Sequence, residues 1–260
     1  MTALDLDALR VSAERAARAG GEVVRSHFGR ARDVRAKASG DWVSEADLAS
    51  EATVRAVLEA ESPLPVLGEE AGGVIPDTGW LVDPLDGTAN FLHRFDAVGV
   101  SVGLVVEGVP AVGVVVAPIL DRCYSAATGR GATRDGVPIA VSARPPEEAI
   151  VSTGLPFRCK ESFVRYRRAL TEVFTRFEDV RRIGAASLDL CWTAEGVFDG
   201  YFELHLGPWD VAAGAVIVRE AGGIVTDWQG HPDAFLASGD ILAGPATSHE
   251  RLLAVARETA

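Results

Sequence analysis

The sequence has few cysteines and no long apolar run. Its three cysteines, Cys123, Cys159 and Cys191, are scattered and form neither a CxxC pair nor a disulfide framework. We therefore expect reduced thiols and a cytoplasmic protein. No apolar stretch reaches the roughly 18 residues of a membrane span. The charged, amphipathic N-terminus also lacks the apolar core of a secretory signal, so we expect no membrane partner.

Positive charge is scarce as well. The chain has 37 acidic and 25 basic residues, which give a net charge of −12. A broad nucleic-acid footprint needs a basic face, so nucleic acid is an unlikely partner. The sequence contains no GxxxxGK[ST] phosphate loop and no zinc-type spacing of Cys or His. An acidic protein that handles an anionic substrate needs local positive charge, and bound cations are one source of it.

The apolar pattern changes at the connector Arg144-Pro145-Pro146. Before it, the spacing predicts helices over 4–28 and 44–61, then short strands and a hairpin that turns at 108–110. After it, strands alternate with predicted helices over 160–177, 186–197 and 208–221. We therefore expect an N-terminal α+β half over 1–143 and a C-terminal α/β half over 144–260. The 260 residues suffice for such halves to share a sizeable core as one functional unit.

Residues 83–88, DPLDGT, place two carboxylates, Asp83 and Asp86, at the end of an apolar strand. Acids this close repel each other and raise each other's pKa, a penalty that a divalent cation removes. Mg²⁺ suits such hard oxygen ligands and keeps positions open for water and phosphate. The amides of Gly87 and Thr88 then lie where a helix N-terminus would bind phosphate. The alternative interpretation is an ordinary strand-to-helix turn with an Asx cap.

Three further acidic elements accompany this segment. Glu69 follows a short apolar strand, and Asp210 lies in the first turn of a helix behind Pro208. Residues 37–47, KASGDWVSEAD, combine a predicted N-cap, Ser44, with Asp47 three residues later. Taken singly, each element has a structural explanation: a solvated loop, an acid favoured by the helix dipole, and a helix cap. Together with DPLDGT they point to a metal site.

The four elements, in this order, resemble the inositol monophosphatase family, within the lithium-sensitive, metal-dependent sugar-phosphatase superfamily. The resemblance runs over nearly the whole chain, and DPLDGT with PWDVAAG is a specific combination. It implies a five-layer αβαβα sandwich of the inositol monophosphatase and fructose-1,6-bisphosphatase type, and a homodimer. The matching segments are 37–47, 68–70, 80–91 (WLVDPLDGTANF), 182–190, 208–214 and 219–223.

The resemblance also implies a role for each matching acid. Glu69, Asp83 and the Leu85 carbonyl would bind one Mg²⁺ ion. Asp83, Asp86 and Asp210 would bind a second, and a third, weaker ion is expected near Glu69. Two metals clamp the attacking and leaving oxygens of a phosphoryl transfer, so this chemistry needs no histidine base.

The catalytic and substrate-binding residues follow from the same resemblance. Thr88, linked to Asp47, and Glu69 would orient the attacking water. Ala185 stands where Ser or Thr is frequent in the family, which leaves the polyol contacts open. Arg181 and Arg182 are interpreted as surface or dimer-contact charges, although a second phosphate is their alternative partner. The implied substrate contacts are Asp86, Gly87, Thr88, Ala186 and Glu203.

The activity implied is Mg²⁺-dependent hydrolysis of a small sugar or polyol phosphate, above all of myo-inositol 1-phosphate, with inhibition by Li⁺. Fructose bisphosphate, histidinol phosphate, glycerol phosphate and 3′-phosphonucleotides stay open as substrates. A regulatory binding protein on the same fold is a non-enzymatic alternative, because fold does not fix function. The GxSxG pattern around Ser101 matches a serine-hydrolase elbow, but it lies inside an alternating strand pattern, whereas the elbow needs a strained turn.

Overall fold

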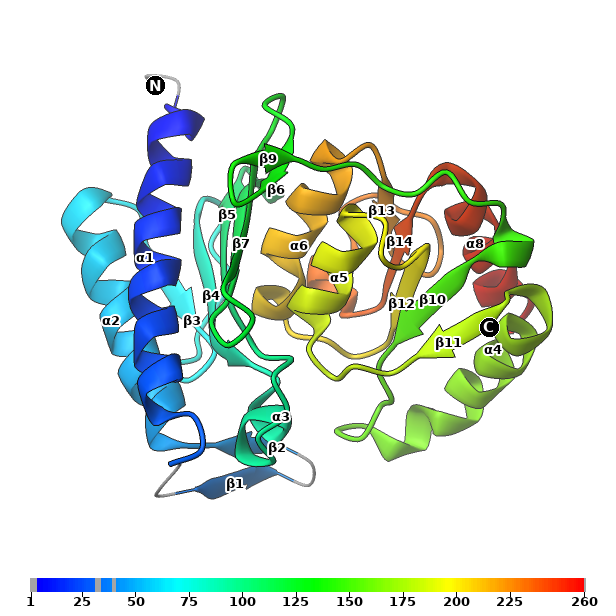
Figure 1. Cartoon of the computed structure of the whole chain (residues 1–260), viewed down its shortest axis with the longest axis horizontal. Helices are drawn as coiled ribbons and strands as arrows, with labels where there is room; N and C mark the ends of the chain where they lie inside the picture. Colours follow the sequence, from blue (N-terminus) through cyan, green and yellow to red (C-terminus); the bar gives the residue numbers. More distant parts are fainter. Residues whose placement is uncertain (1–3, 31–33, 39–40, 260) are drawn as a thin grey trace.

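The computed structural model describes residues 4–30, 34–38 and 41–259, which form alternating layers of helix and sheet (Figure 1). Two helices cover the outer face of a seven-stranded sheet, two more lie between this sheet and a five-stranded sheet, and another pair covers the far side. This arrangement confirms the predicted αβαβα sandwich. The helix pairs are α1 (Leu6–His27) with α2 (Glu45–Glu61), α5 (Ala186–Ala194) with α6 (Pro208–Glu220), and α4 (Phe163–Arg176) with α8 (Ala246–Glu258).

The larger sheet runs in chain order, and its strands are antiparallel except for the parallel pair β3 and β4. Its central strands β4 and β5 are buried along almost their whole length because helices cover both faces of the sheet. The predicted hairpin is confirmed as β5 and β6. The strands are β3 (Val66–Gly68), β4 (Gly79–Asp86), β5 (Gly99–Val106), β6 (Val109–Ala117), β7 (Arg122–Ala127), β8 (Ala132–Arg134) and β9 (Val137–Pro138).

The smaller sheet has the order β11-β10-β12-β14-β13. β10 is parallel to both of its neighbours, whereas β14 is antiparallel to β12 and β13. The C-terminal half is therefore a mixed sheet rather than a purely parallel α/β unit. Its strands are β10 (Ile150–Thr153), β11 (Asp179–Arg181), β12 (Gly200–Glu203), β13 (Ile224–Thr226) and β14 (Ile241–Gly244).

Helix α6 lies unusually close to the larger sheet because the sheet presents glycine to it. A Cβ atom on Gly103 would lie 2.9 Å from the Ala212 side chain, and one on Gly113 would lie 2.2 Å from the Ala213 carbonyl oxygen. Small residues on both sides thus let the two backbones approach. The approach brings the first turn of α6 toward the end of β4, which is where the candidate site lies.

Local sequence signals account for the helix boundaries. Ser44 and Asp47 form a capping box at the start of α2, as the pattern indicated. The predicted helix over 160–177 begins instead with a 3₁₀ turn, Lys160–Ser162, before α4. The predicted helix over 186–197 ends earlier, at Ala194, and Gly196 follows with a positive φ of 73°. The sequence interpretation did not include the hairpin β1 (Arg35–Ala38)–β2 (Asp41–Val43) or the short helix α7 (Phe235–Ser238).

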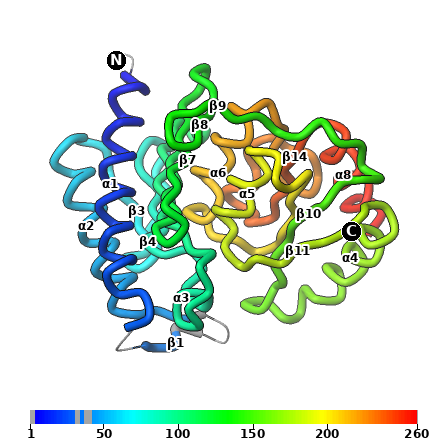
Figure 2. The backbone as a smooth tube through the Cα atoms, viewed as in Figure 1, coloured from blue at the N-terminus to red at the C-terminus, as the bar shows by residue number. Residues whose placement is uncertain are grey.

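Three clusters of buried apolar side chains join the layers. One lies between α1, α2 and the larger sheet, one surrounds α5 and α6, and one lies beneath α4 and α8 (Figure 2). The boundary between halves at 143/144 stays a prediction, although the strands of the larger sheet end at Pro138 and those of the smaller one begin at Ile150. None of the helices in the described ranges is long and apolar enough to cross a membrane.

Candidate active site

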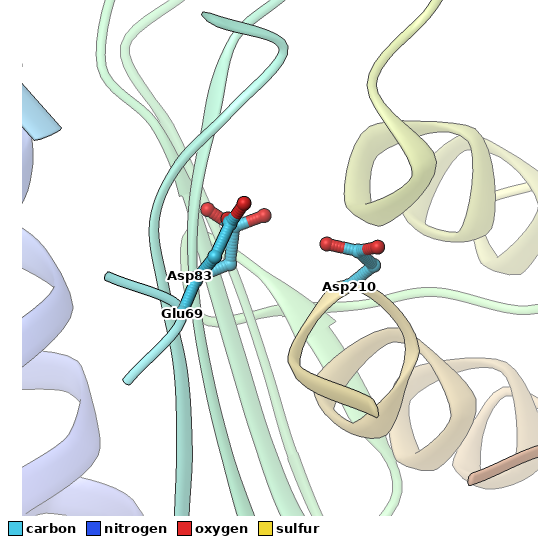
Figure 3. Close-up of side chains that lie close together, drawn as sticks. All are labelled: Glu69, Asp83 and Asp210. Carbon is cyan, nitrogen blue, oxygen red and sulfur yellow. The ribbon is translucent and has the colours of Figure 1, made fainter. Parts of the chain in front are cut away.

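Three carboxylates meet between the two sheets. Glu69 follows β3, Asp83 lies on β4, and Asp210 belongs to the first turn of α6. One oxygen from each lies within 4.8 Å of the others, and Figure 3 shows the three side chains converging from opposite sides of the gap. The structure thus brings together residues that are 14 and 127 positions apart in the chain (69 to 83, and 83 to 210).

Each acid is held by its local backbone. The Leu85 amide donates to Asp83 Oδ1 at 2.9 Å, which fixes the turn that Pro84 begins. The register of β4 against β5 shifts between Asp83 and Asp86, so the strand bulges at this point. The Gly207 amide donates to Asp210 Oδ2 at 2.7 Å, so Asp210 caps α6 as well as facing the cluster. Helix capping and a role in the site are therefore not alternatives for this residue.

The cluster carries more negative charge than its surroundings neutralise. Burial raises the pKa of Asp83 well above its ordinary value, and the neighbouring Glu69, Asp86 and Asp210 raise it further. Burial and Glu69 raise the pKa of Asp210 to about 7. The guanidinium of Arg158 lies 3.9 Å from Glu69 Oε1. Because the Arg158 side chain is 46% exposed, solvent weakens its attraction to Glu69. Three crowded carboxylates, of which Asp83 and Asp210 have raised pKa values, fit a hard divalent cation such as Mg²⁺.

Asp86 lies outside this trio and has a partner that the sequence did not reveal. Its Oδ2 accepts hydrogen bonds from the Ser187 amide at 2.7 Å and from the Ser187 hydroxyl at 2.6 Å. Burial raises the pKa of Asp86, and the Ser187 bonds oppose that rise. Because both bonds end on Oδ2, Oδ1 is the oxygen left to turn toward a metal.

The predicted link between Thr88 and Asp47 is present. The Thr88 hydroxyl lies 3.1 Å from Asp47 Oδ1 and 3.2 Å from the Leu85 carbonyl oxygen. The other Asp47 oxygen accepts from the Ser44 amide at 2.8 Å and the Ser44 hydroxyl at 2.6 Å. Of the rest of the 37–47 element, residues 39 and 40 and the side chains at 37 and 41 lie outside the described part of the chain.

Gly87 connects the acids to the short helix α3 (Thr88–Leu92). Its φ of 84° is left-handed, and a Cβ atom there would lie 3.0 Å from the Ala97 carbonyl oxygen. Both facts require glycine. The helix that the Gly-Thr pair was expected to open is therefore present, although it is only 5 residues long.

An open cavity of about 130 Å³ contains the cluster. Ala186 and Glu203, the expected substrate contacts of the C-terminal half, line it. Burial raises the pKa of Glu203 to about 7, and the Tyr201 hydroxyl donates a hydrogen bond to it. The expected site residues that line the cavity are Glu69, Asp83, Leu85, Asp86, Gly87, Thr88, Ala186, Glu203 and Asp210, while Asp47 lies behind Thr88.

Arg158, which the sequence analysis did not name, also lines the cavity, together with Arg182. Arg182 stacks over Phe157, with its guanidinium carbon 5.7 Å from the ring centroid. The Arg182 side chain is exposed, in agreement with its interpretation as a surface charge, and it lies on the cavity wall; its dimer contact stays a prediction. Asn90 is a second omission, because its amide donates to the carbonyls of Ala97 and Ile183 and so joins the two halves at 2.8 and 3.1 Å.

The serine-hydrolase alternative fails on geometry. Ser101 is fully buried inside β5, and its hydroxyl donates to the Trp209 carbonyl oxygen at 3.0 Å. A nucleophile elbow would instead expose the hydroxyl on a strained turn. His93 is the C-cap residue of α3 and is not one of the residues that line the cavity.

Fold and site together define a five-layer α/β protein with a carboxylate cluster, suited to a divalent cation, in an open cavity. The chain belongs to the inositol monophosphatase family, whose model matches residues 5–260. It is 38% identical over 253 residues to the Nus factor SuhB of Salmonella typhimurium, covering 95% of this chain and 94% of that one. It is 39% identical over 249 residues to a fructose-1,6-bisphosphatase/inositol-1-monophosphatase of Aquifex aeolicus, covering 94% and 93%.

A solved structure, the extragenic suppressor protein suhB from Bartonella henselae, superposes with a TM-score of 0.89 at 34% identity. The match covers 95% of this chain and 98% of that one. These comparisons confirm the family and the fold, and membership of this family indicates a phosphatase. They do not support the expectation that nucleic acid is an unlikely partner, because relatives at this level of identity carry the name Nus factor.

Proposed function

We propose that this protein hydrolyses a small phosphate monoester of the myo-inositol 1-phosphate type with two or three Mg²⁺ ions. The observation that carries the proposal is the trio of Glu69, Asp83 and Asp210, which lines the cavity and of which Asp83 and Asp210 are buried. When bound, Mg²⁺ neutralises phosphate oxygens and lowers the pKa of water. Asp83, Asp86 and Asp210 would hold one ion, and Glu69 would bind a second with Asp83 and the Leu85 carbonyl.

The remaining residues orient the reactants. Thr88, hydrogen-bonded to Asp47 at 3.1 Å, and Glu69 hold the water in line with the phosphorus. The amides of Gly87 and Thr88 would bind the phosphate, and Asp86 would be a further contact of the substrate. Ala186 and Glu203 contact the hydroxyls of the leaving group from the opposite wall.

A panel of esters tests the proposal: inositol 1-phosphate, fructose 1,6-bisphosphate, histidinol phosphate, glycerol phosphate and 3′-phosphoadenosine, each with Mg²⁺, with EDTA, and with Li⁺ added to Mg²⁺. We expect release of phosphate that requires Mg²⁺, is inhibited by Li⁺ and is fastest for inositol 1-phosphate. The Asp86→Asn variant should purify as folded protein with little turnover. Undiminished turnover by that variant would refute the site assignment.

A bisphosphate is a second candidate substrate, because two arginines line the cavity. Arg158 and Arg182 supply positive charge on the wall formed by the C-terminal half. The relative from Aquifex aeolicus is named for both activities. Arg182→Ala should raise the KM for fructose 1,6-bisphosphate about 10-fold and leave that for inositol 1-phosphate within about 2-fold. Equal effects on both substrates would exclude a second phosphate site at Arg182.

A binding role like that of the relatives named Nus factor is compatible with catalysis at this site. We retain the homodimer and the cytoplasmic location as parts of the proposal, the latter supported by three free cysteines, two of them buried. Light scattering measures the mass of the protein in solution and so tests whether it is a homodimer. A pull-down with Asp86→Asn separates binding from turnover, because the substitution leaves the surface outside the cavity unchanged.

A further inference from the structure

Helix α2 packs against the two strands that position Glu69, Asp83 and Asp86. It packs against β3 and β4, with its first turns beside the ends of these strands (Figure 1). Asp47 in its first turn accepts from Thr88, and the Ser50 hydroxyl donates to the Pro84 carbonyl oxygen at 2.8 Å. Glu51 is four residues beyond Asp47, so it lies on the same face of the helix one turn later.

Glu51 is a buried carboxylate that no role in the proposed reaction uses. It is 6% exposed. Its two oxygens accept the amides of Glu70 at 2.8 Å and Ala71 at 3.2 Å, the two residues that follow Glu69. A carboxylate that accepts two backbone amides at once fixes the turn that contains them, because charge-assisted hydrogen bonds are short and strong.

The same turn is fixed from its other side. The Glu69 amide donates to the Val82 carbonyl oxygen at 3.0 Å, directly before Asp83. Arg55 pairs with Glu51 at 3.6 Å and donates to the Val66 carbonyl oxygen at 2.9 Å, which ties the start of β3 to the same helix. The backbone of Glu69 is thus held between β4 and α2, and only its side chain is directed to the acid cluster.

Gly68 shows how closely Glu51 fits this turn. A Cβ atom at residue 68 would lie 2.3 Å from the Glu51 carboxyl carbon and from Oε2. The glycine is needed for the approach of Glu51 rather than for its own backbone, because its φ is outside the left-handed range. An alanine there would push the carboxylate away from the amides.

We propose that Glu51 is a positioning residue that sets the place of Glu69 relative to Asp83. It would act through the two amide bonds and touch neither substrate nor metal. This inference rests on the proposed role of Glu69 as a metal ligand. Partners behind a ligand commonly change metal affinity about 10–100-fold when they are removed.

Mg²⁺ affinity by calorimetry tests the inference on the full-length chain, with Glu59→Gln as the matched control. Glu59 lies on the same helix and also pairs with Arg55 at 3.6 Å, but its side chain is 58% exposed. We expect Glu51→Gln to weaken Mg²⁺ binding about 10-fold and Glu59→Gln to leave it within about 2-fold. At saturating Mg²⁺, the KM for the ester should stay within about 2-fold in both variants, since neither contacts it.

Equal Mg²⁺ affinity of wild type, Glu51→Gln and Glu59→Gln would overturn the positioning role. If Glu51→Gln does not purify as folded protein, Gly68→Ala takes its place, since it displaces the carboxylate without removing it. The same 10-fold loss is then expected, and wild-type affinity overturns the inference. A wild-type chain that binds Mg²⁺ but hydrolyses no ester refutes the proposed function alone, because the calorimetric comparison does not depend on turnover.

Discussion

The two walls of the cavity differ in how their polar groups are held. On the wall formed by α2, β3, β4 and α3, the carboxylates accept hydrogen bonds from nearby backbone or hydroxyl groups, such as Leu85 to Asp83 and Thr88 to Asp47. On the opposite wall, Arg158 and Arg182 lie on connections between helices and strands and are exposed. A preorganised wall suits charge stabilisation, whereas an adaptable wall suits recognition of varied leaving groups.

Asp210 belongs to the C-terminal half, but α6 brings it to the acids on the wall formed by α2, β3, β4 and α3, which we call the metal wall. We expect Asp210→Asn to lower kcat/KM about 100-fold or more, equivalent to about 3 kcal/mol, since the second ion loses a charged ligand. Steady-state kinetics over a range of Mg²⁺ concentrations measures this. Loss restored fully by excess Mg²⁺ would show that Asp210 only raises affinity, whereas no loss at all would place the metals elsewhere.

Ser187 tests whether the metal wall depends on the other half. Its amide and hydroxyl both donate to Asp86 Oδ2. Ser187→Ala keeps the amide bond and removes the hydroxyl, so we expect about a 10-fold weaker apparent affinity for Mg²⁺. Ser152→Ala is the control, because that buried serine belongs to β10 and faces Asp189 rather than an acid of the proposed metal site. Identical Mg²⁺ dependence in the two variants would count against a supporting role for Ser187.

Glu203 tests whether the opposite wall of the cavity recognises the leaving group. We expect Glu203→Gln to lower kcat/KM about 5-fold for inositol 1-phosphate, whose leaving group carries hydroxyls that hydrogen-bond to a carboxylate. p-Nitrophenyl phosphate has no such hydroxyls, and its hydrolysis should change less than about 2-fold. Parallel assays of the two esters decide the point. An equal loss on both would mean that Glu203 acts on the metal wall instead.

The smallest expected effect is the pH dependence of stabilisation by Mg²⁺. The pKa of Asp210 is about 7 in the folded, metal-free protein and 3.8 in its ordinary range. Between these values the folded state holds a proton that the unfolded chain releases, so this group's contribution to the free energy of unfolding falls as pH rises. Mg²⁺ replaces that proton, because ligands must be deprotonated.

The rise in melting temperature caused by Mg²⁺ should therefore grow between about pH 5.5 and pH 8, by a few degrees. Differential scanning with EDTA or Mg²⁺ at each pH measures it. Burial lowers the pKa of His249 to about 4. The contribution of this histidine to the free energy of unfolding therefore falls as pH falls, whereas that of Asp210 falls as pH rises. His249 contributes to both curves and cancels in the difference. A Mg²⁺ effect independent of pH would contradict the raised pKa of Asp210.

Much of the fold followed from local patterns. The capping box at Ser44, the proline that begins α6 and the buried strand that ends at DPLDGT are each written within a few adjacent residues. The candidate acids could be named for the same reason, because strand ends and helix starts place them. The 3₁₀ turn before α4 and the β1–β2 hairpin were missed, since short elements carry too few residues to show a period.

The sequence by itself therefore determined the element types, the family and the carboxylates available to a metal. Tertiary structure alone decided which groups support them. Ser187 and Asp86 are 101 residues apart, and Glu51 reaches the Glu70 amide 19 residues away. Such contacts depend on how layers pack: glycine at 103 and 113 lets α6 approach, and glycine at 68 admits Glu51. Periodicity reports the face a residue occupies, but not the partner that packing brings to it.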